Sequence, residues 1–101
     1  DAALDQAVEG IVNGIWFNQG HVCCAGSRLL VEESIVDQLI LKLTQRAQTL
    51  RVGDPLDKNT DIGAINSRAQ LDKIKEIVQS GLDEGNTLYR NGALYVSNEL
   101  E

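Results

Sequence analysis

The residues best suited to covalent chemistry lie together in one short segment. Cys23 and Cys24 are adjacent, and His21, the single histidine of the chain, lies two residues before the first of them. A cysteine thiolate is a strong nucleophile, and a cysteine activated by its surroundings can attack an electrophilic carbon. Free cysteines are nevertheless most often small buried apolar residues. Residue type alone therefore favours a packing role, and the flanking sequence must decide between packing and catalysis.

Other uses of the polar and thiol side chains are disfavoured by their spacing. A disulfide between neighbouring cysteines is strained, and no second cluster of cysteine or histidine completes a zinc site. Asp54, Asp57 and Asp61 are irregularly spaced and lack the closing glutamate of a calcium loop. These aspartates therefore indicate a polar turn, and we expect no metal site.

Length and charge narrow the class of protein. The 101 residues accommodate one small domain but not a complete two-domain enzyme. A net charge of −6 and a pI of about 4.6 argue against nucleic-acid binding, because no basic patch can neutralise phosphates. Charges interrupt every apolar stretch, and the N-terminus lacks a signal-peptide pattern. We therefore expect no membrane span and a reducing, cytoplasmic location.

An amphipathic helix is predicted just before the two cysteines. Its apolar residues recur at helical spacing, at Leu4, Val8, Ile11 and Ile15. The helix should end before Gly20. Residues 18–26 are rich in small residues and are predicted to form a loop that carries both cysteines.

Two more helices are predicted after the cysteines. The second begins at Ser34, which has the spacing of a capping box with Asp37, and runs to about Leu50. The third begins at Ser67, with Gln70 at the same spacing. Its expected buried face consists of Leu71, Ile74, Ile77, Val78 and Leu82.

Short apolar runs predict strands between and after these helices. Leu29–Val31 fits a buried strand of a parallel sheet. Leu88-Tyr89 and Leu94–Val96 flank Asn91-Gly92, which is a favourable hairpin turn. The order helix, strand, helix, helix, strand indicates the α/β class.

The loop from Phe17 to Arg28 reads Phe-Asn-Gln-Gly-His-Val-Cys-Cys-Ala-Gly-Ser-Arg, and it resembles the cysteine active-site motif of the aldehyde dehydrogenase superfamily. Further resemblance is found at residues 1–10, 30–34, 52–57 and 62–64. The resemblance extends to about Glu84. It implies that residues 1–101 are a single fragment of an α/β catalytic domain, with about three helices and short, mostly parallel strands. Residues 99–101, ending in Leu100-Glu101, resemble a cloning-derived tail.

The resemblance implies that Cys23 is the catalytic nucleophile and that Cys24 is a small neighbour without a role. In this family the thiolate attacks an aldehyde, the thiohemiacetal passes hydride to NAD or NADP, and water hydrolyses the thioester. Gly20 and Gly26 would let the backbone pass close to substrate and cofactor. The backbone N–H of the nucleophile would serve as one oxyanion donor.

Cofactor contacts and partners are also implied by the resemblance. Gln70 and Lys73 match positions that contact the nicotinamide-side ribose in some members of the family. Capping and solvation explain the same two residues without any cofactor. An aldehyde substrate, the rest of a parent chain and a dimer or tetramer are the expected partners, and no cofactor is expected bound to the fragment alone.

Two features limit the activity that the resemblance implies. The family usually has glutamine or glutamate where this chain has His21. The family's general-base glutamate lies in a Glu-Leu-Gly-Gly segment outside these 101 residues, so the isolated chain should not turn over aldehyde. A non-catalytic, scaffold-type member is the alternative that His21 motivates. A redox-sensing pair at Cys23-Cys24 is a third hypothesis.

Overall fold

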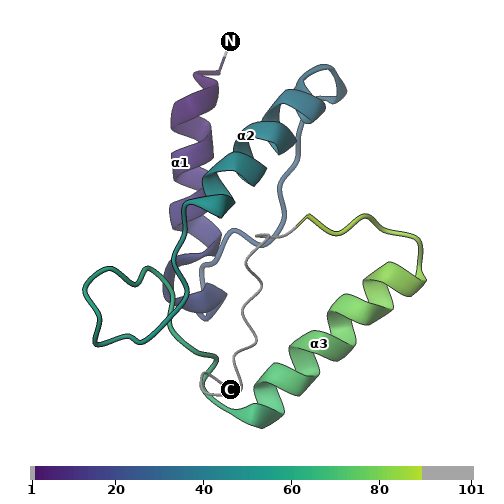
Figure 1. Ribbon diagram of the computed structural model, residues 1–101. Helices are drawn as coiled ribbons and strands as arrows, with labels where there is room; N and C mark the ends of the chain where they lie inside the picture. The colour runs from purple at the N-terminus through teal and green to yellow at the C-terminus, as the bar shows by residue number, and fades with distance from the viewer. Residues whose placement is uncertain (1, 90–101) are drawn as a thin grey trace.

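The computed structural model describes residues 2–89, which form three α-helices and two short 3-10 helices (Figure 1). In chain order the elements are α1 (Leu4–Ile15), η1 (Phe17–Gly20), η2 (Glu33–Ile35), α2 (Val36–Gln48) and α3 (Arg68–Asp83). Helices α1 and α2 pack together, whereas α3 is set apart from them (Figure 1). Within residues 2–89, no helix combines the length and the apolar character needed to cross a membrane.

A small apolar core joins α1 to α2. Val8 and Val12 are each 5% exposed, and Leu39 is 4% exposed. The two valines are four residues apart, so they face the same side of α1. Partly buried side chains complete the cluster, namely Leu4, Ile11, Trp16, Val31 and Leu43. The first predicted helix is therefore confirmed, and its predicted period is the one that forms the core.

Two ion pairs show that α1 and α2 run in the same direction. Lys42 Nζ lies 2.7 Å from Asp5 Oδ1, and Arg46 Nε lies 2.8 Å from Glu9 Oε1. Glu9 follows Asp5 by four residues in α1, and Arg46 follows Lys42 by four residues in α2. The chain must therefore return along the whole of α1, roughly 18 Å for its 12 residues, before α2 begins. Residues 21–32 make this return (Figure 1).

The predicted strand at Leu29–Val31 lies in the returning segment and forms no ladder within residues 2–89. The β pairing of the described residues is limited to an isolated parallel bridge between Val52 and Ile62. A strand exists only with a neighbour to pair with, and without one Leu30 is left 90% exposed. The described residues are thus helical rather than α/β. The predicted turn of the terminal hairpin lies beyond residue 89, outside the described residues.

The start of α2 differs from the prediction. The capping box expected at Ser34 and Asp37 is wrong, because Ser34 lies inside the 3-10 turn of η2. Ile35 precedes the first α-helical residue, and no side chain caps it. A capping residue precedes the helix, and from there its side-chain oxygen accepts the N2 or N3 amide. Ser34 already lies inside a helical turn, so its hydroxyl is not in that place. The helix also ends at Gln48, before the expected Leu50.

The predicted start of α3 is confirmed, but its predicted buried face is wrong for the described residues. Ser67 Oγ accepts a hydrogen bond from the Gln70 N–H at 3.1 Å. No residue of α3 is buried, and Ile77 is 59% exposed. An amphipathic pattern shows which face of a helix is apolar but not which element covers it. Among the described elements, none packs against α3.

The connection between α2 and α3 is held by aspartate side chains. Their carboxylates accept backbone N–H groups at 2.9 Å: Asp54 from Leu56, Asp57 from Asn59, and Asp61 from Arg51. The bonds of Asp54 and Asp57 to backbone two residues further on are typical of turns, whereas Asp61 joins the two ends of the loop. The predicted polar turn is therefore confirmed.

Candidate active-site loop

Cys23 and Cys24 occupy the two central positions of a tight turn. The turn is closed by the N–H of Ala25, which donates to the carbonyl of Val22 at 3.0 Å. Both thiols are free and exposed. The described structure therefore presents them to solvent instead of packing them into the core, and a small electrophile can reach either one.

The downstream side of this turn is tied to the end of α1. The N–H of Gly26 donates to the carbonyl of Gly14 at 2.8 Å. Gly14 belongs to the last turn of α1, where carbonyl groups have no helical partner. This hydrogen bond satisfies one such carbonyl and fixes where the chain leaves the cysteine turn.

The upstream side of the turn has an unusual backbone. Asn18, Gln19 and Gly20 have φ values of 52°, 57° and 78°, so three successive residues are left-handed. For an L-residue other than glycine this conformation costs roughly 1–2 kcal/mol, less for asparagine than for glutamine. At Gly20 an added Cβ would also lie 3.2 Å from the carbonyl oxygen of Ile15. Both the positive φ and this close approach therefore favour glycine at position 20.

Two hydrogen bonds between Asn18 and His21 close the left-handed segment. The N–H of His21 donates to the carbonyl of Asn18 at 3.0 Å. The side-chain Nδ2 of Asn18 donates to the carbonyl of His21 at 3.1 Å. We call this pair of bonds the Asn18–His21 clamp. The sequence motif draws attention to Asn18 but does not reveal the clamp.

The imidazole of His21 is exposed and forms no hydrogen bond to either thiol. Its backbone torsions, φ −85° and ψ 63°, are those of the centre of an inverse γ-turn. The described geometry does not make a Cys–His nucleophile–base pair.

A second contact ties the left-handed segment to the connection before α3. A Cβ added at Gly63 would lie 3.2 Å from Nε2 of Gln19 and 3.6 Å from Cβ of Pro55. The Gln19 side chain therefore covers Gly63, and a larger residue at position 63 would displace that side chain. Sequence reasoning missed this contact, although a glycine next to apolar residues is a signal of close approach.

Gln70 and Lys73, the two residues suggested for cofactor binding, both lie exposed on α3. The backbone N–H of Gln70 caps the helix through Ser67, and Lys73 Nζ lies 3.9 Å from Glu76 Oε2. Helix α3, which carries both residues, packs against no other helical element of residues 2–89.

A resolved pKa shift among the described residues lies away from the cysteines. The pKa of the Arg46 guanidinium is raised above its ordinary value, chiefly by the hydrogen bond to Glu9. That pair bridges α2 and α1, so the effect concerns the packing of the helices. No ion pair of the described residues includes a residue of the turn from Val22 to Ala25.

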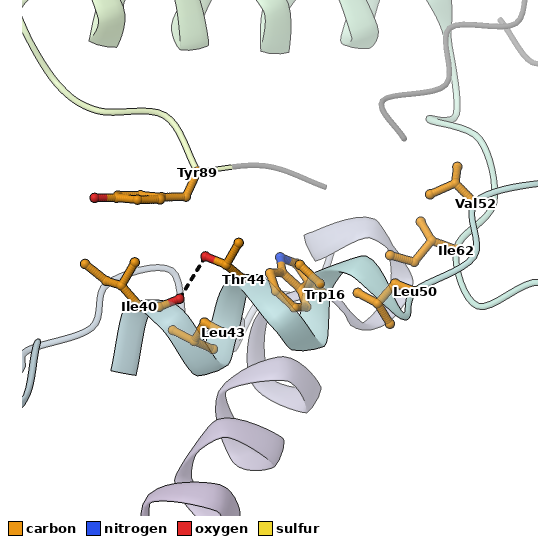
Figure 2. Close-up of a pocket in the computed structure, with 9 residues that line it drawn as sticks. Trp16, Ile40, Leu43, Thr44, Leu50, Val52, Ile62 and Tyr89 are labelled. Atoms are coloured by element: carbon orange, nitrogen blue, oxygen red, sulfur yellow. Dashed lines mark hydrogen bonds between the residues drawn. The ribbon is translucent and has the colours of Figure 1, made fainter. Parts of the chain in front are cut away.

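An apolar cavity of about 410 Å³ lies on the side of α2 (Figure 2). Its lining consists of Trp16, Ile40, Leu43, Thr44, Ala47, Leu50, Val52, Ile62 and Tyr89. The Thr44 hydroxyl donates to the carbonyl of Ile40 at 2.8 Å, so it is already satisfied. Neither cysteine lines the cavity. Its side chains provide packing surface rather than catalytic groups.

Comparison with known proteins identifies relatives along the whole chain. The sequence model of the Aldehyde dehydrogenase family matches residues 1–101. An aldehyde dehydrogenase of Davidiella tassiana is 45% identical over 92 residues, which are 91% of this chain and 18% of that protein.

Solved structures similar to this chain are also aldehyde dehydrogenases. An NAD-dependent aldehyde dehydrogenase from Sinorhizobium meliloti is 42% identical with a TM-score of 0.81, over 84% of this chain and 17% of that one. A betaine aldehyde dehydrogenase from Staphylococcus aureus, solved with NAD⁺, is 33% identical with a TM-score of 0.90, over 99% and 20%. The chain therefore spans about a fifth of the length of these relatives.

Proposed function

The chain belongs to the aldehyde dehydrogenase family, and from this premise we propose that it is the segment carrying the nucleophilic cysteine of an enzyme that oxidises an aldehyde to a carboxylic acid. The observation that supports this most is the exposed turn at Cys23, inside the motif from Phe17 to Arg28. We propose NAD or NADP as the hydride acceptor of the complete protein. The S. meliloti relative is NAD-dependent and the S. aureus relative was solved with NAD⁺.

In the proposed reaction Cys23 acts as a thiolate. Its Sγ forms a bond to the aldehyde carbon while the electron pair of the C=O bond moves to the oxygen, which gives the oxyanion form of a thiohemiacetal. The backbone N–H of Cys23 makes no hydrogen bond within the described residues, so it is open to donate to that oxygen. When bound, the cofactor accepts the hydride that converts the thiohemiacetal to a thioester, which water then hydrolyses.

Cys23 is chosen over Cys24 by its place in the motif, since both thiols are exposed. The test is NAD(P)-dependent aldehyde oxidation by the complete protein and by its Cys23→Ser and Cys24→Ser variants. Cys23→Ser should reduce kcat by at least about 10³-fold, because it removes the nucleophile. Cys24→Ser, the matched control, should stay within about twofold. A loss confined to Cys24→Ser would contradict the assignment.

For the 101-residue chain alone, we propose background activity. The family's general base lies outside its sequence, and base assistance is typically worth about 10²–10⁴ in rate. Clear aldehyde turnover by the isolated chain with NAD would refute this. A folded complete protein that oxidises no aldehyde, with or without Cys23, would instead support the non-catalytic alternative.

The remaining proposals concern the complete protein. Leu29–Val31 would pair within a mostly parallel sheet, and Gln70 and Lys73 would contact the cofactor ribose. Gln70→Ala and Lys73→Ala should then raise the KM for the cofactor and leave the KM for aldehyde unchanged. A dimer or tetramer and a cytoplasmic location complete the proposal.

A further inference from the structure

We propose that Asn18 is a positioning residue for Cys23, and that its side-chain amide holds the cysteine turn through the carbonyl of His21. The proposal rests on the function proposed for Cys23. It starts from the left-handed segment of Asn18, Gln19 and Gly20, whose φ values of 52°, 57° and 78° are unfavourable for the two non-glycine residues. Strained backbone of this kind persists only where surrounding contacts hold it in place.

The contacts that hold the segment converge on Asn18. Its carbonyl accepts the His21 N–H at 3.0 Å, and its Nδ2 donates to the His21 carbonyl at 3.1 Å. Asparagine also tolerates the left-handed region better than other residues with a Cβ. Asn18 therefore contributes both a backbone conformation and a hydrogen-bond donor.

The Asn18–His21 clamp lies close to Cys23 in the sequence. Val22 alone separates His21 from Cys23, and the carbonyl of Val22 closes the cysteine turn by accepting the Ala25 N–H at 3.0 Å. Downstream, the turn is fixed by the hydrogen bond from Gly26 to Gly14 at 2.8 Å. Without the Asn18 amide, the carbonyl of His21 would lose its donor and the upstream side of the turn would keep only the backbone bond from His21 to Asn18 and the contact of Gln19 with Gly63. The direction of the thiol would then vary more.

This role is separate from holding the fold. Asn18 is exposed and takes no part in the core of Val8, Val12 and Leu39. A variant at position 18 should therefore loosen the cysteine turn while the packing of α1 on α2 stays intact. Asn13, an exposed asparagine on α1, provides the matched control.

Three substitutions separate the donor from the backbone conformation. Asn18→Asp keeps the size and the left-handed tolerance, but its carboxylate cannot donate. Asn18→Gly keeps the conformation and removes the side chain, and Asn18→Ala loses both. Amide hydrogen exchange is measured in the complete protein at Ala25 and across α1. All three variants should exchange about three- to tenfold faster at Ala25, the effect of one lost hydrogen bond, with α1 and Asn13→Ala unchanged.

Wild-type exchange at Ala25 in Asn18→Asp or Asn18→Gly would overturn the proposal, because the amide would then be dispensable. Equally faster exchange throughout α1 would also overturn it, because Asn18 would then be holding the fold. In the complete protein Asn18→Asp should lower kcat about tenfold or more with KM for aldehyde unchanged, and an unchanged kcat would contradict positioning. A complete protein without activity would refute the proposed function, while the exchange result would still decide the role of Asn18.

Discussion

Asn18 and His21 are joined by two hydrogen bonds, and both of them use backbone atoms of His21. The His21 N–H donates to Asn18 at 3.0 Å, and Nδ2 of Asn18 donates to the His21 carbonyl at 3.1 Å. The imidazole takes no part. The side chain at position 21 can therefore differ from the family's usual glutamine or glutamate without loosening this part of the loop.

Replacing this imidazole should leave Cys23 unaffected. The test uses the 101-residue chain with Cys24→Ser, in which Cys23 is the one remaining thiol. There His21→Gln should change the rate of alkylation by iodoacetamide by no more than about twofold, because replacing an exposed side chain without partners usually has a small effect. The rate is measured across pH. An inflection of the rate that disappears in His21→Gln would show that the imidazole does act on the thiol.

The stability of the α1–α2 pair should depend on Leu39. Leu39 is 4% exposed, so Leu39→Ala should lower the free energy of unfolding by about 2–5 kcal/mol. Urea unfolding followed by the fluorescence of Trp16, the single tryptophan, measures this change. Leu41 lies on the same helix and is 57% exposed, so Leu41→Ala should change it by less than about 0.5 kcal/mol. Equal losses in the two variants would contradict the described core.

The ion pair between Glu9 and Arg46 should contribute a small, salt-sensitive amount. A double-mutant cycle with Glu9→Gln and Arg46→Gln should give a coupling of about 0.2–1 kcal/mol, since both side chains are partly exposed. Salt at about 1 M should reduce that coupling. A coupling that stays constant in salt would argue against the pair.

The sign of the pH effect at Arg46 follows from its pKa. The hydrogen bond to Glu9 raises this pKa in the folded state. The stabilisation by the charged guanidinium is thus complete below the unfolded-state pKa and is lost only as pH rises through the folded value. Arg46→Gln should therefore leave the slope of stability against pH unchanged from neutral to moderately alkaline conditions.

The N-terminus of α3 should weaken when its cap is removed. Ser67→Ala should destabilise the helix by about 1 kcal/mol, because the Gln70 N–H loses its acceptor. Amide exchange at Gln70 should become faster. Ser80 lies inside the same helix, so Ser80→Ala should not accelerate exchange at Gln70. Faster exchange in both variants would indicate a general effect on α3.

Local signals in the sequence were enough to predict α1, the Ser67 cap, the polar turn and the loop that carries the cysteines. Each of these features depends on residues a few positions apart. The 3-10 turn at Glu33–Ile35 was missed because a serine and an aspartate three positions apart fit both a cap and a continuing turn. The left-handed conformation of Gln19 was missed because glutamine gives no local sign of it.

Features that depend on distant partners could not be predicted in the same way. The strand at Leu29–Val31 needs a neighbouring strand, and the apolar face of α3 needs a covering element. Ile77 remains 59% exposed because no described element supplies that cover. The family of the chain, by contrast, was predictable from the residues around Cys23, which the family match confirms.

The central claim is that Cys23, and not Cys24, attacks the carbonyl carbon. The most direct test treats the complete protein with an activated acetyl ester, stops the reaction with acid before the thioester is hydrolysed, and maps the acetylated peptide by mass spectrometry. The label then marks the attacking sulfur. We predict acetylation of Cys23, unchanged in Cys24→Ser and abolished in Cys23→Ser. Acetylation of Cys24, or equal labelling of both exposed thiols, would contradict the assignment.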